Sequence, residues 1–143
     1  MSQIIVKNVD GITFVGRGES KHWVVMDGPE TFGGSDAATR PMELFLISLA
    51  GCTGADVASL LKKMRVNYQK MEIHIDSERA VEHPKVYTKI DLVYKISGQN
   101  LEAEKDKIEK SIDLSQNKYC SISAMIRAAN IPLNYTYELI NKE

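Results

Sequence analysis

The stretch RPMELFLISLAGCT, residues 40–53, decides how this chain folds. Pro41 is well tolerated in the first turn of a helix, so we expect a long helix to begin there. From Leu44 to Cys52 almost every residue is apolar or small, and basic residues return only after Ser59. A helix that is apolar on all sides is buried rather than amphipathic. The sequence therefore predicts a central helix that the rest of the fold encloses.

The segments on both sides of this helix show strand and helix patterns. A turn-rich loop at 27–39 is too polar and too rich in glycine for regular structure. We expect strands at 4–9, 12–17, 23–26, 71–76, 86–96 and 135–139, and helices at 101–114 and 117–129. In the strand at 86–96 the even-numbered side chains, Val86 to Ile96, are expected to face inward. This order is typical of an α+β fold and not of a doubly wound sheet.

Length and charge limit the possible functions. The chain has 143 residues, which fits one domain spanning 1–143. Its net charge of −1 argues against a nucleic-acid partner and against an electrostatic membrane anchor, because both need a basic surplus. No apolar run approaches 18 residues and no secretory signal is visible, so we expect a cytoplasmic protein without a membrane partner. Two cysteines in that compartment act as thiols rather than as a permanent disulfide.

Cys52 lies in the most apolar part of the chain, between Gly51 and Gly54. A glycine inside a helix costs about 1 kcal/mol relative to alanine, so two glycines beside one thiol need a reason. Close approach of another backbone is one reason, and room for a substrate beside the sulfur is another. The alternative is a small core residue, since free cysteine is often fully buried. Asp56, if close, would raise the pKa of the Cys52 thiol by like-charge repulsion.

Cys120 is the second candidate site residue. With Asn117 as the helix N-cap, Cys120 occupies the third helical position. Free backbone N–H groups and the helix dipole favour a thiolate there. Local chemistry alone therefore favours Cys120 over Cys52 as the ionised thiol. A packed core thiol is the alternative for this residue as well.

The remaining polar residues form no cofactor or metal motif. The sequence contains no P-loop and no dinucleotide-binding loop. His22, His74 and His83 are scattered, so the histidines and cysteines could bind zinc only if the fold gathered them. We therefore expect no cofactor and no metal.

Several segments resemble the OsmC/Ohr family of osmotically induced and organic-hydroperoxide-resistance proteins. Residues 40–53 resemble the central helix of that family, and residues 115–122, SQNKYCSI, resemble its second cysteine segment. Residues 82–86, EHPKV, which precede a long strand, are similar to a YhfA-type subgroup of OsmC-like proteins. The resemblance covers essentially the whole chain. It implies an intertwined homodimer, with an antiparallel six-stranded sheet on each side of buried central helices.

The resemblance also implies a peroxidase chemistry for the two cysteines. Cys52 would attack the peroxide oxygen as a thiolate and become a sulfenic acid, and Cys120 would condense with it to a disulfide. An external dithiol would reduce that disulfide. Small organic or lipid hydroperoxides would suit an apolar pocket. These roles follow the family rather than the local argument that favours Cys120.

The family pairs its first cysteine with an arginine and a glutamate. Glu43 lies one residue nearer to Cys52 than the family glutamate does, and it could instead cap its helix or pair with Arg40. Thr39 or Arg40 is the expected N-cap of that helix. Arg40, just before the helix, and Arg17, in the N-terminal strand region, are the candidate arginines, and either could act across the dimer.

We therefore expect a thiol-dependent peroxidase that reduces organic hydroperoxides in stress defence. A non-enzymatic binder of a small lipophilic molecule at the dimer interface, with redox-sensing or packing thiols, is the alternative. A thiol that detoxifies other electrophiles is a third hypothesis. An adduct on Cys52 in place of a disulfide would distinguish it.

Overall fold

The computed structural model of the protein describes residues 2–142. The chain divides into two compact units, Met1–Ile47 and Ser48–Glu143, and each is described by itself. The single domain that the sequence predicts for residues 1–143 stays a prediction.

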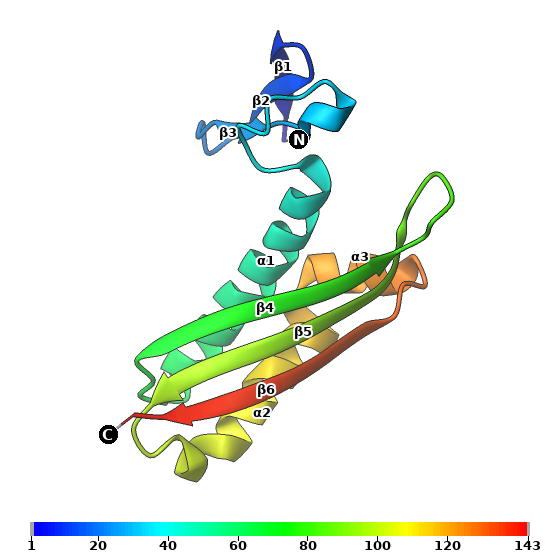
Figure 1. The fold of residues 1–143 in the computed structure, drawn as a ribbon. Coiled ribbons are helices and arrows are strands. Elements are labelled where there is room, and N and C mark those ends of the chain that lie inside the picture. The colour runs from blue at the N-terminus through cyan, green and yellow to red at the C-terminus, as the bar shows by residue number, and fades with distance from the viewer. Residues whose placement is uncertain (1, 143) are drawn as a thin grey trace. The chain divides into compact units, whose positions relative to one another are not determined.

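The N-terminal unit contains a three-stranded antiparallel sheet. Its strands, in spatial order, are β1 (Ile5–Asp10), β2 (Thr13–Arg17) and β3 (Val24–Met26) (Figure 1). Gly11 has a φ of +49° in the turn between β1 and β2, a conformation that glycine adopts readily. The short 3-10 turn η1 (Glu30–Phe32) lies in the loop that follows. The three predicted strands are confirmed, and each begins one residue later than expected.

The loop after β3 is built around the buried carboxylate of Asp27. Its oxygens accept the backbone N–H groups of Gly28, Ser35 and Ala37 at 2.8, 3.1 and 3.1 Å. These hydrogen bonds, that of Gly28 foremost, hold the pKa of Asp27 below its ordinary value of 3.8. A Cβ added to Gly34 would lie 1.9 Å from the Gly28 carbonyl oxygen, so this close approach requires glycine. One acidic side chain therefore orders a loop that the sequence predicts only as irregular.

Helix α1 (Pro41–Lys63) begins where the sequence predicts. The backbone N–H of Arg40 donates to Glu43 Oε2 at 3.1 Å. This contact is the glutamate half of a capping box, and it identifies Arg40 as the N-cap. The fully buried side chains of α1 lie on one face at intervals of four residues: Leu49, Thr53, Val57 and Leu61.

The other faces of α1 are half-buried or exposed in the single chain, which differs from the burial on all sides that the sequence predicts. Ile47, for example, is 56% exposed. The helix is also long and apolar enough to cross a membrane, with a mean hydropathy of 1.8 over its most apolar window, 22% of which is buried. A core helix of a soluble protein passes the same test, so this is weak evidence for a membrane span. Full burial of α1 requires a further surface.

The C-terminal unit contains a second three-stranded sheet. Its strands, in spatial order, are β4 (Lys70–Arg79), β5 (Tyr87–Gly98) and β6 (Leu133–Asn141). β4 and β5 are antiparallel, but β5 and β6 are parallel. The prediction of purely antiparallel sheets is therefore wrong for this unit.

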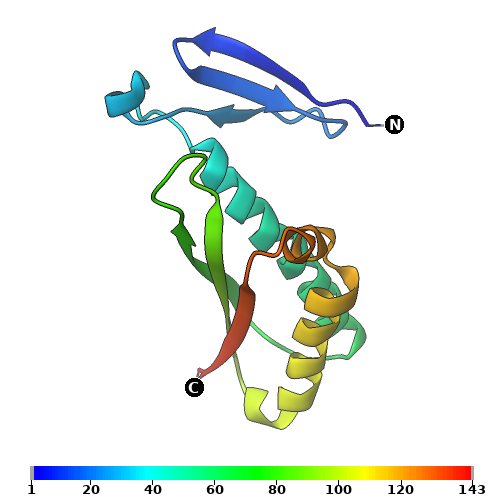
Figure 2. The ribbon, with the colours of Figure 1, turned by 90° about the vertical axis from the view of Figure 1, so that its right-hand side faces the viewer.

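A helical crossover between β5 and β6 accounts for their parallel pairing. It consists of η2 (Leu101–Glu104), α2 (Lys105–Leu114), the π-helical turn η3 (Ser115–Tyr119) and α3 (Ser121–Ala128). Parallel strands need a long connection of this kind, because the chain must return to the same end of the sheet. Together with the C-terminal half of α1, these helices cover one face of the sheet, as the view in Figure 2 shows. The α+β fold is thus as predicted.

The core of this unit lies between β5 and the helices. Its buried side chains include Ile90, Leu92, Tyr94 and Ile96 of β5, Ile108 and Ile112 of α2, and Ile126 of α3. At the start of β5 the predicted orientation is wrong, because Tyr87 is buried whereas Val86 is exposed. The pairing with β4 shifts register between Glu78 and Arg79. A shift of one residue turns the side chains to the opposite face of the sheet.

Candidate dithiol site

Cys52 and Cys120 are remote in the sequence but meet in the C-terminal unit. Their sulfur atoms and a carboxylate oxygen of Asp56 all lie within 4.8 Å of one another. Both thiols are free. A disulfide needs about 2 Å between its sulfurs, so the two sulfur atoms are near each other but not bonded. The structure therefore brings together the two cysteines that the sequence singles out.

The two glycines near Cys52 on helix α1 have different surroundings. A Cβ added at Gly51 would meet no described atom within 4 Å, whereas one added at Gly54 would lie 3.1 Å from Ile73 Cδ1 of β4. Gly51 thus leaves room beside the half-buried sulfur. Gly54 permits close approach to the sheet, although the neighbour is a side chain rather than a backbone. The expected approach of another backbone is therefore wrong for Gly54, and room for a substrate beside the Cys52 sulfur stays a prediction.

Cys120 is the N-cap of α3 and not its third residue. In the π-helical turn η3, the Cys120 N–H donates to the Ser115 carbonyl at 2.8 Å. The Cys120 sulfur accepts the Ser123 N–H at 3.4 Å. Asn117, the predicted cap, lies inside η3, and its side chain donates to Asp113 Oδ1. The wider turn moves the helix start by three residues, which a 3.6-residue pattern does not predict.

A buried polar network lies beside the two thiols. The Thr53 hydroxyl is 2.6 Å from the Tyr94 hydroxyl and 2.7 Å from Ser115 Oγ. Ser115 Oγ donates to Asp56 Oδ2 at 3.1 Å. Gln116 Nε2 donates to the hydroxyls of Tyr94 and Thr53 at 2.7 and 3.1 Å. The network joins α1, β5 and η3, and so fixes the helix of the first thiol against the turn that leads to the second.

Arg127 of α3 completes this network. Its guanidinium donates to the Gln116 backbone carbonyl and, at 3.0 Å, to Gln116 Oε1. Because the amide oxygen is engaged in this way, the amide NH₂ group is directed toward Tyr94 and Thr53. The sequence does not predict these network residues. The one signal for them is the polar Thr53 beside Cys52, in the most apolar part of the helix.

The surroundings of Cys52 raise the pKa of its thiol above the ordinary value of 9.0. Burial is the largest cause, and the Cys120 thiol and the Asp56 carboxylate add to it. The backbone N–H of Ile122 acts in the opposite direction. The predicted repulsion between Asp56 and Cys52 is thus present. In this environment Cys52 is mainly a protonated thiol at pH 7.

The three charged candidates, Arg17, Arg40 and Glu43, belong to the N-terminal unit, and each has a partner there. The Arg17 guanidinium lies 4.9 Å from the centre of the Trp23 ring, a cation–π contact. Arg40 forms surface ion pairs with Asp36 and Glu43, at 3.6 and 4.0 Å. Capping and pairing, the alternatives weighed for Glu43, both occur. A pairing of these residues with the first cysteine stays a prediction.

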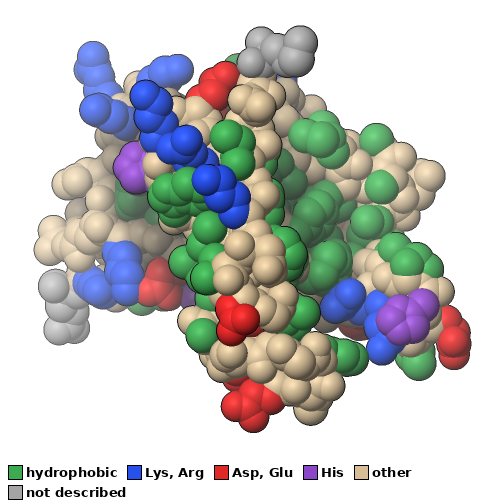
Figure 3. Space-filling model, turned by 90° about the horizontal axis from the view of Figure 1, so that it is seen from above, with side chains coloured by type: hydrophobic (Ala, Val, Ile, Leu, Met, Phe, Trp, Pro, Cys, Tyr) green, Lys and Arg blue, Asp and Glu red, His purple; other side chains and the backbone are tan. Residues whose placement is uncertain are grey.

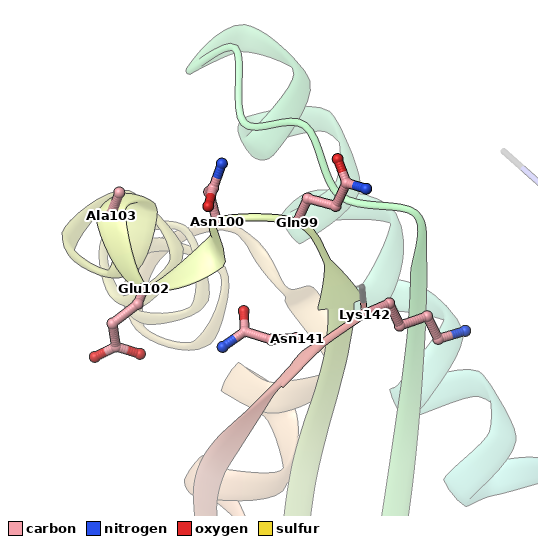
Figure 4. Close-up of a pocket in the computed structure, with 6 residues that line it drawn as sticks. All are labelled: Gln99, Asn100, Glu102, Ala103, Asn141 and Lys142. Carbon is pink, nitrogen blue, oxygen red and sulfur yellow. The ribbon is translucent and has the colours of Figure 1, made fainter.

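Two cavities of the C-terminal unit differ in their relation to the thiols. One of about 190 Å³ is lined by Asp56, Ser59, Leu60, Lys63 and Tyr119. The other, of about 850 Å³, is lined by Gln99 and Asn100, by two residues of η2 and by the end of β6 (Figure 4). Its lining is mostly polar and includes neither cysteine. It is therefore not the apolar pocket predicted beside the thiols.

Comparison with known proteins places the fold and the two cysteines in one family. The family model described as OsmC-like protein matches residues 33–136, a range that contains both thiols. The chain belongs to the OsmC-like family. Over 138 residues it is 36% identical to Protein YhfA of Escherichia coli K12, covering 96% of this chain and 98% of YhfA. The resemblance noted from the sequence is confirmed.

Solved structures support the same OsmC-like fold. A hypothetical protein from Aquifex aeolicus VF5 superposes with a TM-score of 0.84 at 27% identity, covering 100% of this chain and 98% of that one. The organic hydroperoxide resistance protein OsmC from Legionella pneumophila superposes with a TM-score of 0.63 at 16% identity, covering 96% of each chain. At that identity the second likeness shows the fold alone.

Proposed function

We propose that this OsmC-like protein is a thiol-dependent peroxidase that reduces organic hydroperoxides. One observation carries the proposal: the sulfurs of Cys52 and Cys120 lie within 4.8 Å of one another. Two free thiols at this separation can give up two electrons as they form a disulfide. The choice of substrate is supported by the Legionella pneumophila protein of the same fold, whose name refers to organic hydroperoxide resistance.

The proposed cycle has three balanced steps. The Cys52 thiolate attacks a peroxide oxygen, so that an S–O bond forms and the O–O bond breaks. The leaving alkoxide takes up the proton that the Cys52 thiol released and departs as the alcohol. The Cys120 sulfur then attacks the sulfenic acid on Cys52, which forms the S–S bond and releases water. An external dithiol reduces this disulfide through a mixed disulfide and is itself oxidised to a disulfide.

The exposure of the two thiols supports this order of roles. Cys52 is half-buried beside the exposed Gly51, whereas Cys120 is only 2% exposed. A peroxide must reach the first thiol from solvent, but the second thiol needs only to reach the first. Access therefore favours Cys52 as the attacking sulfur.

The raised pKa of Cys52 means that the first step needs a cation close to the sulfur. On the family resemblance we propose Arg40 or Arg17 for this task, with Glu43 as the orienting carboxylate. Arg40 would leave only surface ion pairs, which cost little to break, about 0–1 kcal/mol. Arg40→Gln and Arg17→Gln are compared for the rate of Cys52 oxidation. A tenfold loss identifies the partner, and no loss in either variant contradicts this assignment.

We also propose that two chains form a homodimer. Large apolar side chains are exposed on the single chain, and those on the face in Figure 3 are shown in green. The exposed apolar side chains of the chain include Ile47 on α1, and Val6, Phe14 and Val24 on the N-terminal sheet. Contiguous apolar surface of this kind is normally covered in solution, and the family resemblance identifies the cover as a second copy. Light scattering at micromolar concentration is expected to give the mass of two chains, and the mass of one chain contradicts the dimer.

The peroxidase proposal is tested by consumption of cumene hydroperoxide with dithiothreitol as the dithiol. The wild-type protein is expected to turn over, and Cys52→Ser is expected to abolish consumption. Cys120→Ser should still form a sulfenic acid on Cys52, which dimedone traps. Ser121→Ala, a change at an exposed position next to Cys120, is the matched control and should keep full activity. A wild-type protein that is inert to several hydroperoxides, with both thiols still reduced, contradicts the proposal.

A further inference from the structure

We propose that Cys52, Asp56 and Cys120 form a three-ligand binding site for a thiophilic divalent cation, with Zn²⁺ as the probe. No spacing in the sequence predicts this site, because its ligands come from two distant segments and include no histidine. The proposal concerns binding and does not rest on peroxidase activity.

The geometry of the three side chains supports the site. Around a tetrahedral zinc ion, with bonds of about 2.3 Å to sulfur and about 2.1 Å to oxygen, ligand atoms lie roughly 3.5–3.8 Å apart. The two sulfurs and the Asp56 oxygen all lie within 4.8 Å of one another. A closure of at most about 1.3 Å therefore completes the triangle. Cys52 and Asp56 stand one turn apart on the same face of α1, and Cys120 faces them from the start of α3.

Neighbouring hydrogen bonds hold the ligands in place. Ser115 Oγ donates to Asp56 Oδ2 at 3.1 Å, and the remaining lone pairs of the carboxylate are available to an ion. The Ser123 N–H donates to the Cys120 sulfur at 3.4 Å. Outer contacts of this type orient the ligands of metal sites in proteins.

The charge balance also favours a cation. Within residues 2–142, Asp56 forms no ion pair. When the ion binds, each thiol releases its proton to solvent, which places two thiolates and one carboxylate around it. The opposing group is Lys63, which lines the small cavity together with Asp56. That cavity, of about 190 Å³, also gives solvent a path to the carboxylate.

The ligand types determine which ions fit. Thiolates select zinc and other thiophilic ions, whereas magnesium and calcium prefer a shell made of oxygens alone. With three protein ligands, the site has the open fourth position that distinguishes exchangeable zinc from closed structural zinc. We therefore expect exchangeable binding of one Zn²⁺ per chain, and no binding of Mg²⁺ at the same concentrations.

The test is a zinc titration of the reduced full-length protein against a chromogenic chelator, without peroxide. One ion per chain is expected. Cys52→Ser and Cys120→Ser should each weaken binding at least a hundredfold, and Asp56→Asn about tenfold. His74→Gln, which changes an exposed histidine that pairs with Glu72, is the control and should bind like the wild type.

A second measurement uses only the wild-type protein, so it tests the site even where a variant folds poorly. Stoichiometric zinc should protect both thiols of the wild-type protein from alkylation, and protein oxidised to the disulfide should bind no zinc. Unchanged binding in either cysteine variant, or loss of binding in His74→Gln, overturns the site. A protein that binds zinc but does not consume hydroperoxide contradicts only the proposed function, so the two failures are distinguishable.

Discussion

Ser115 Oγ donates a hydrogen bond to Asp56 Oδ2, at 3.1 Å, and thereby joins the π-helical turn before Cys120 to the helix that carries Cys52. The bond holds a carboxylate beside two sulfurs. A negative charge in that position opposes the ionisation of a neighbouring thiol. It therefore opposes formation of the Cys52 thiolate with which the proposed cycle begins, and this is the step that the proposed arginine would assist.

Replacing Asp56 should make Cys52 more reactive. In Asp56→Asn the Ser115 hydrogen bond can persist, but the charge that raises the pKa of the Cys52 thiol is removed. The pKa should therefore fall, and alkylation of Cys52 by iodoacetamide at pH 7 should become faster. Burial is the larger cause of the raised pKa, so the gain should be only a few-fold. The rate is measured by peptide mass spectrometry in metal-free buffer, with the exposed Asp106→Asn as the control. Slower alkylation in Asp56→Asn contradicts the electrostatic role given to Asp56.

Removing the hydroxyl of Tyr94 should destabilise the protein. Tyr94 is fully buried, and its hydroxyl is bonded to Thr53 and Gln116. Tyr94→Phe leaves those groups short of a partner, which costs about 1–3 kcal/mol in the free energy of unfolding. Tyr137→Phe is the matched control, because the Tyr137 hydroxyl donates to the exposed Glu109 and its loss should cost less. Urea denaturation measures both. Equal costs would show that the buried network adds no stability.

Local sequence patterns were sufficient for most of the fold. Pro41 and the apolar residues after it predict α1, and period-two alternation predicts β4 and most of β5. The parallel pairing of β6 was missed, because strand direction depends on the whole helical crossover and not on any one segment. The start of α3 was also missed, because the wider turn at η3 depends on tertiary contacts of Ser115 and Gln116.

Glu43 should act as a helix cap. Its carboxylate accepts the Arg40 N–H, so Glu43→Ala should lower the free energy of unfolding by about 0.5–1 kcal/mol. Glu43→Gln should retain most of that stability, because glutamine can make the same capping contact. Thermal denaturation compares the two variants. Equal losses in both would contradict the cap. Loss of peroxide turnover in the Gln variant, with stability retained, would show that Glu43 also serves the first cysteine.

The stability contributed by Asp27 should depend on pH. Because its folded pKa lies below 3.8, its contribution is present above that value and is lost as pH falls through the folded pKa. Asp27→Asn should therefore be less stable than the wild type at pH 7, and the difference should shrink below pH 3.8. Melting temperatures of both proteins from pH 2 to pH 7 test this. A difference that does not change with pH would show that the charge on Asp27 contributes nothing.

The polar residues around the two thiols were less predictable from the sequence than the cysteines themselves. Two thiols in recognisable segments identify Cys52 and Cys120, and the structure places them together. Nothing local marks Tyr94 or Gln116 as their neighbours, because a tyrosine in a strand and a glutamine in a turn are ordinary residues. Only the packing of α1 on β5 and η3 brings these groups beside the thiols.

Disulfide formation between the two thiols is measured by the intact mass of the reduced protein after one equivalent of cumene hydroperoxide. We predict a loss of about 2 Da and, after digestion, one peptide pair joined through Cys52 and Cys120. An unchanged mass, with both thiols open to alkylation, would contradict it.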